Sequence, residues 1–171
     1  MLLQYLLVCS LLLLAACRGD NANDEADPKH ASASALSPDQ YRERQQSIAD
    51  SVLDAARPVE KIVEQLGTGY AIGSEGLRDT VTTLAKNTDC FRNGRNTDPY
   101  LAGVVNIVAR MTAAGTDLVR VQTATTRWTS AAGDLVNACL NSAMKKWRLD
   151  ARYGAPAGYI VQVRFKPDTT R

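Results

Sequence analysis

The sequence predicts an α+β fold in which two helices pack on a small three-stranded antiparallel sheet, preceded by an additional amphipathic helix. Residues 101–123 hold two runs of strand-like alternation joined by a Gly-containing turn, which is typical of a β-hairpin. Residues 130–147 repeat apolar side chains at helical spacing. Residues 159–165 alternate again after a Gly- and Pro-rich break. The order after the first helix is therefore helix, strand, strand, helix, strand.

Composition limits the classes of protein to which the chain can belong. Its 171 residues, 45% hydrophobic and 22% charged, suit one soluble domain with appendages. The formal net charge is +2 and no basic run occurs, whereas a nucleic-acid partner usually requires a concentrated basic face. We therefore expect no nucleic-acid binding.

Residues 1–16 form an apolar run that suits a signal peptide and is short for a membrane span. Leu14-Ala15-Ala16-Cys17 resembles the bacterial lipobox, in which cleavage precedes a cysteine that is then acylated, usually with palmitate among its chains. A plain signal peptide or an uncleaved anchor is the alternative. Arg18, rather than Asp, after the cysteine favours the periplasmic face of the outer membrane, with the protein held there by its lipid.

Residues 17–37 are rich in Asp, Asn, Ala and Ser and predict a flexible tether. The single histidine, His30, lies in it and is expected to have no role. Residues 38–73 then predict an amphipathic helical segment, with Ser37 as N-cap and Pro38 in the first turn. Pro58 should kink or split it, and Gly67 should end it. Its apolar stripe is either a packing surface or, alternatively, a partner-binding face.

The next helix should begin at Ser74 and run towards Cys90 and Phe91, ending in the turn-rich residues 93–99. The last helix should bury one stripe and expose Asn137 and Asn141 on the other side. The buried stripe comprises Leu135, Val136, Cys139, Leu140, Ala143 and Trp147. The final strand should bury one face and leave one wet face, because apolar Tyr159, Val161, Val163 and Phe165 alternate with polar Gln162, Arg164 and Lys166.

Residues 75–166 resemble the C-terminal domain of TonB-type proteins, in the branch named for the AgmX and PglI gliding-motility proteins. The matching features are Cys90-Phe91, the Pro99–Gly103 lead-in to the hairpin, Cys139, Trp147 and a final strand at 159–165. The resemblance implies a TonB-like domain over residues 74–171. Leu149 and Asp150 replace the family's usual aromatic and proline, and a transmembrane helix with a Pro-rich spacer is missing, so we expect the fold without the energy-transducing role.

Under this interpretation Cys9 leaves with the signal peptide, Cys17 takes lipid, and Cys90 and Cys139 remain as a pair in an oxidising periplasm. We expect a disulfide between them; two buried free thiols are the alternative. No zinc-ligand spacing is present, and the domain lacks a histidine for Ser-His or Cys-His catalysis. Asp117, Asp134 and Asp150 suit turns and helix starts. We therefore expect no metal, no cofactor and no enzyme activity.

The expected function is that of a protein-binding adaptor for another envelope protein. A periplasmic inhibitor or immunity lipoprotein, and a pilotin-like secretion or pilus accessory protein, are the alternatives. A final strand added to a hairpin must lie at a sheet edge, and TonB-like domains bind extended segments at such an edge. The expected partner-binding residues are Tyr159, Val161, Gln162, Val163, Arg164 and Lys166. The competing interpretation is that these charges only protect the edge from aggregation. Lys145, Lys146 and Arg148 either attract an anionic partner or complement the helix dipole.

Overall fold

The structure is a computed structural model that describes residues 36–150 and 158–167 of the compact unit 36–171. The predicted signal peptide, the predicted lipidation site at Cys17, His30 and most of the predicted tether lie outside the described residues. So do residues 151–157 and 168–171.

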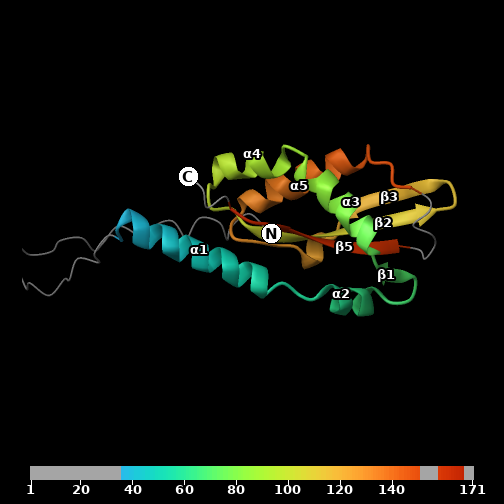
Figure 1. Cartoon of the computed structure of the whole chain (residues 1–171), viewed down its shortest axis with the longest axis horizontal. Coiled ribbons are helices and arrows are strands. Elements are labelled where there is room, and N and C mark those ends of the chain that lie inside the picture. The colour runs from blue at the N-terminus through green and yellow to red at the C-terminus, as the bar shows by residue number, and fades with distance from the viewer. Residues whose placement is uncertain (1–35, 151–157, 168–171) are drawn as a thin grey trace, which may run out of the picture. The chain divides into compact units, whose positions relative to one another are not determined.

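The described residues form a mixed α+β structure around one five-stranded sheet, shown in Figure 1. The sheet order is β1-β5-β2-β3, and β4 also pairs with β2. The strands are β1 (Tyr70–Ile72), β2 (Gly103–Thr112), β3 (Gly115–Val121), β4 (Arg127–Trp128) and β5 (Gly158–Phe165). The predicted hairpin is confirmed as β2–β3, and β5 pairs antiparallel with β2. The sheet is larger than the predicted three strands. β1 pairs in parallel with β5, and β4 pairs antiparallel with β2 on the same edge of β2 as β3.

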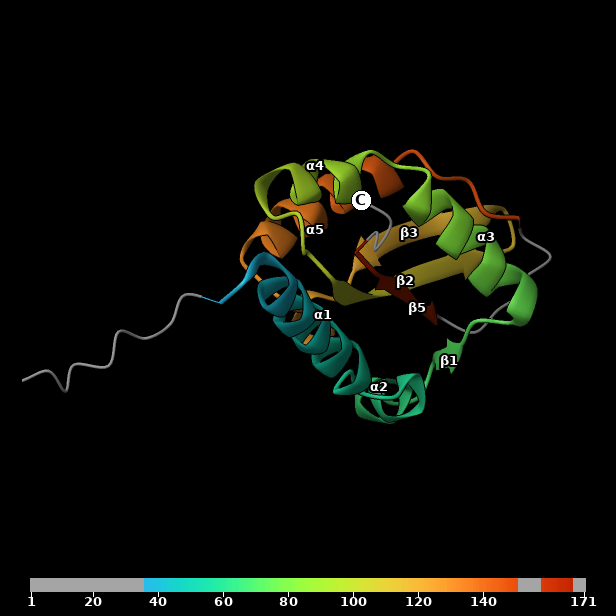
Figure 2. The same ribbon diagram turned by 60° about the vertical axis from the view of Figure 1, so that its left-hand side comes forward.

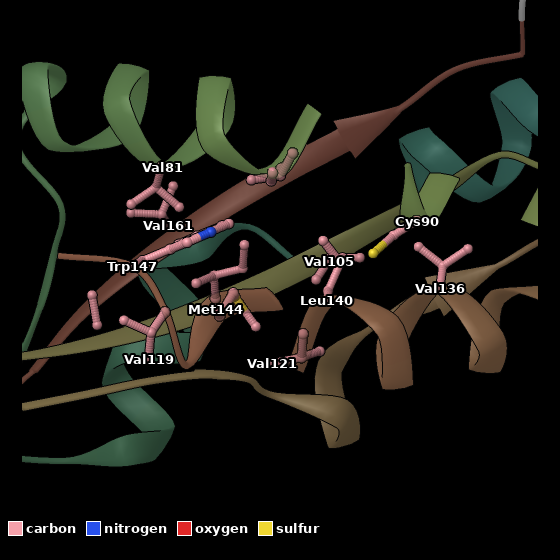
Figure 3. Close-up of a cluster of buried hydrophobic side chains, with 14 of the residues drawn as sticks. Val81, Cys90, Val105, Val119, Val121, Val136, Leu140, Met144, Trp147 and Val161 are labelled. Carbon is pink, nitrogen blue, oxygen red and sulfur yellow. The ribbon is translucent and has the colours of Figure 1, made fainter. Parts of the chain in front are cut away.

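Three helices cover one face of the sheet: α3 (Glu75–Lys86), α4 (Cys90–Thr97) and α5 (Ala132–Met144). Ser74 caps α3 as predicted, since its Oγ accepts a hydrogen bond from the Leu77 N–H. Figure 3 shows the main core, in which valines of β2, β3 and β5 meet side chains of these helices and Trp147. The apolar face of β5 lies here, with Val161, Val163 and Phe165 at most 2% exposed.

Two further helices, α1 (Pro38–Asp54) and α2 (Val59–Leu66), cover the opposite face (Figure 2). Ser37 and Gln40 form a capping box at the start of α1, and Pro58 separates the two helices as the sequence indicates. Ile62 of α2 packs on Val108 and Ile160 in a second, smaller core. Both sheet faces are thus covered, which explains why β2 is buried at seven successive residues rather than at alternate ones.

Several local predictions were wrong. Residues 90–97 form the separate helix α4 instead of turning at Asn93, because packing on α5 outweighs the local turn preference, and Gly94 allows the two helices to approach closely. A Cβ at Gly94 would lie 2.5 Å from Val136 Cγ2. Leu135 is 58% exposed, and the large apolar side chains that α5 buries are Val136, Leu140 and Met144.

The faces of α5 and β5 that were predicted to be exposed to solvent are in part buried. Asn137 is only 7% exposed, and Asn141 accepts a hydrogen bond from the Val121 N–H at 2.8 Å. Gln162 is half-buried, because the connection between α1 and α2 covers the face of β5 that was expected to contact water. Only Arg164 and Lys166 of that predicted face are exposed.

Candidate functional site

The outer edge of β5 is covered over its first half. β1 pairs in parallel with Gly158–Ile160, the Gly158 N–H donates to the Gly69 carbonyl at 2.9 Å, and the Gly73 N–H donates to the Ile160 carbonyl at 3.0 Å. The expectation that the whole strand lies at an edge is therefore wrong for these three residues.

The second half of this edge has no strand beside it within residues 36–150 and 158–167. Main-chain N–H and C=O groups alternate in direction along a strand. Because Gly158 and Ile160 point towards β1, the main-chain groups of Gln162 and Arg164 point the same way, beyond the end of β1. We call these outward groups of Gln162 and Arg164 the open half-edge.

The predicted partner-binding side chains divide into separate sets. Val161 and Val163 are buried in the main core and Tyr159 is half-buried against it. Gln162 Nε2 donates to the Arg57 carbonyl at 3.0 Å and to Asn106 Oδ1 at 3.1 Å, so this side chain holds the α1–α2 connection to the sheet. Only Arg164 and Lys166 remain exposed to meet a ligand.

A pocket of about 420 Å³ lies at the far end of the open half-edge. Its described lining residues are Lys86, Phe91, Arg95, Arg164, Phe165 and Lys166, and we call it the basic pocket. Four of these six side chains are cationic and none is acidic. The tertiary structure brings the end of α3 and the middle of α4 beside the end of β5. Sequence reasoning missed Lys86, Phe91 and Arg95, because no local pattern relates them to β5.

Aromatic rings fix the floor of the basic pocket. The ring centroids of Phe91 and Phe165 lie 4.9 Å apart, and those of Trp128 and Phe165 lie 5.7 Å apart. The Arg95 guanidinium carbon lies 5.3 Å from the centroid of the Phe91 ring, which is a cation–π distance. Trp128 in turn is held by Asn137, whose Oδ1 accepts from the indole Nε1–H at 3.1 Å. The positions of the rings at the pocket floor are therefore set by packing in the core.

The predicted disulfide between Cys90 and Cys139 is confirmed, with the two Cα atoms 5.5 Å apart. It joins the first residue of α4 to α5 and so places the neighbouring Phe91 at the pocket. The cysteines are 49 residues apart, and closing a loop of that length contributes about 4 kcal/mol in the chain-entropy account.

No family model, curated protein or solved structure matches this chain.

The remaining candidate groups have local structural roles. Arg148 Nη1 donates to the carbonyls of Lys145 and Trp147, which favours the helix-terminus interpretation of that basic cluster. Asp117 pairs with Arg110 at 2.7 Å, and Asp134 lies in the first turn of α5. In the part of the chain that the structure describes, no three His, Cys, Asp or Glu side chains gather as metal ligands, and no helix is long and apolar enough to cross a membrane.

Proposed function

We propose that this chain is a lipid-anchored periplasmic adaptor of the bacterial outer membrane, whose TonB-like domain binds an envelope protein by adding one of that protein's extended segments to β5. The open half-edge is the observation that carries this proposal. It offers main-chain donors and acceptors in strand geometry, which an extended segment satisfies without further rearrangement.

The likeness to TonB C-terminal domains supports the proposal through the order of its elements. A helix, a hairpin, a disulfide-bearing helix and a final strand occur in this order as α3, β2–β3, α5 and β5, with α4 inserted before the hairpin and the short β4 after it. The lipid anchor rests on Leu14-Ala15-Ala16-Cys17. An anchored adaptor needs only to hold its partner, which agrees with a site built from main-chain groups and charges.

Side-chain contacts must add to the strand pairing. Each main-chain hydrogen bond contributes a net of about 0.5–1.5 kcal/mol, and the open half-edge is short. Because β1 covers Gly158–Ile160, a partner strand has room only beside the second half of β5. Specificity then depends on what borders that half, and Arg164 and Lys166 are the exposed side chains there.

The test begins by identifying the partner through crosslinking in membranes. Binding of that purified partner is then compared between Gln162→Pro and Gln162→Val. Both variants lose the side-chain hydrogen bonds of Gln162, but only proline removes the outward N–H. We expect Gln162→Pro to lose about tenfold or more in affinity relative to Gln162→Val while circular dichroism shows a folded protein.

Val163→Pro serves as the reference for damage to the sheet. Val163 pairs with Val105, and its N–H points towards β2, so proline there should disrupt the fold itself. If the folded Gln162→Pro and Gln162→Val proteins bind the partner with equal affinity, the strand-addition mechanism is wrong.

A further inference from the structure

We propose that the basic pocket binds carboxylates of an acidic segment in the partner protein, next to the point where that segment pairs with β5. This inference rests on the proposed strand addition and specifies the chemistry of the partner. Its first support is charge, since the described lining has four cations and no acidic side chain. Such a cluster attracts anions and repels cations.

Continuity with the open half-edge indicates a peptide as the source of the carboxylates. Arg164 contributes its main chain to the half-edge and is also one of the residues that line the pocket. A segment paired with β5 would therefore continue directly into the pocket. Arg164 and Lys166 both line the pocket and both are exposed, so their charges act together on one short stretch of ligand.

The aromatic floor adds an apolar requirement to the ionic one. Phe91 is only half-buried and presents ring surface in the pocket, while the buried Phe165 ring supports it from below with the two centroids 4.9 Å apart. A volume of about 420 Å³ accommodates one or two side chains. The best ligand is therefore an acidic residue beside an apolar one, with the apolar group on the Phe91 ring and the carboxylate at Lys86, Arg164 or Lys166.

The pocket is preorganised, which reduces the cost of binding. The disulfide fixes the start of α4 next to Phe91, and the Trp128–Asn137 hydrogen bond fixes the ring that stacks on Phe165. Arg95 packs over Phe91 instead of extending into solvent. Only Lys86, Arg164 and Lys166 need to become ordered when the ligand arrives.

The experiment selects binders to the full-length protein from a phage-displayed library of random short peptides. We expect the selected peptides to be enriched in Asp or Glu next to an apolar residue. Their affinity should fall by about two- to 25-fold in Lys86→Gln/Lys166→Gln, because each exposed ion pair contributes about 1.4- to fivefold. The matched control is Lys145→Gln/Lys146→Gln, which removes the same charge from exposed positions outside the pocket.

Each outcome decides the proposal. Peptides without acidic enrichment, or an equal loss of affinity in both double variants, would overturn the carboxylate assignment. Selection that succeeds only after Asp20, Asp24, Glu25, Asp27 and Asp168 are changed to amides would assign the pocket to the chain's own acidic residues and overturn the partner assignment. Failure to select any peptide counts against the pocket and strand addition alike.

Gln162→Pro separates the two proposals. If acid-free peptides lose affinity in Gln162→Pro relative to Gln162→Val, strand addition stands and the carboxylate pocket fails. If acidic peptides bind both of these variants equally but lose affinity in Lys86→Gln/Lys166→Gln, the pocket stands without strand addition.

Discussion

Asn137 links the interior of the protein to its candidate site through one amide group. It is only 7% exposed, and its Oδ1 accepts the indole N–H of Trp128. Gly133 leaves room for the Trp128 ring, because a Cβ at residue 133 would lie 1.9 Å from the indole Cγ. The ring then stacks on Phe165 at the pocket floor. A single polar residue thus holds one ring of the aromatic cluster by a hydrogen bond.

Replacing Asn137 with Ala should lower the free energy of unfolding by about 1–3 kcal/mol, since the Trp128 N–H loses its acceptor in a largely buried place. Ser142→Ala, at an exposed position of the same helix, should stay within about 0.5 kcal/mol of wild type. Urea unfolding of the oxidised proteins measures both. Equal midpoints for the two variants would show that the amide has no structural role.

The element that most alters the predicted site is the segment from α2 to β1. α2 buries Ile62 against Val108 and Ile160, and Gly67 then ends the helix with a φ of 81°. The chain returns as β1 along the first half of β5. This segment closes one half of the β5 edge, and its end at Ile72 defines where the open half begins. The amphipathic stripe of α2 is thus a packing surface.

The contribution of α2 can be measured with a pair of isoleucines. Ile62→Ala should destabilise the protein by about 2–5 kcal/mol, because Ile62 is 1% exposed and the deletion leaves a cavity over Val108 and Ile160. Ile48→Ala removes the same atoms from a side chain that is 39% exposed and should cost about 1 kcal/mol or less. Thermal or chemical unfolding gives both values. If the two costs are equal, α2 does not stabilise the fold.

The whole molecule combines, in the proposed function, a membrane anchor with a binding domain. Cys17→Ser should release the protein from membranes, because acyl chains supply the attachment. Cys9→Ser is the control: it changes a cysteine that should leave with the signal peptide, so fractionation should be unaltered. Membrane fractionation and mass spectrometry of the mature N-terminus test this. Retention of Cys17→Ser in the outer membrane, together with no acyl mass on wild type, would contradict the lipoprotein proposal.

The amino-acid sequence alone determined the α+β class and the features that depend on neighbours along the chain. The caps at Ser37 and Ser74, the break at Pro58 and the β2–β3 hairpin all follow from such local rules. The pairing of Cys90 with Cys139 was also predicted, because no other cysteines remain in the domain.

Only the tertiary structure decided which edges and faces stay open. β1 pairs with a strand almost ninety residues later, from Tyr70 to Gly158, and three residues are too few to carry a periodic signal. The basic pocket likewise joins Lys86 to Lys166. Hydrophobic periodicity reports that a side chain is buried but not by what, so it could not show that α1 and α2 cover the second face of the sheet. The open half-edge exists because β1 ends at Ile72 while β5 continues to Phe165.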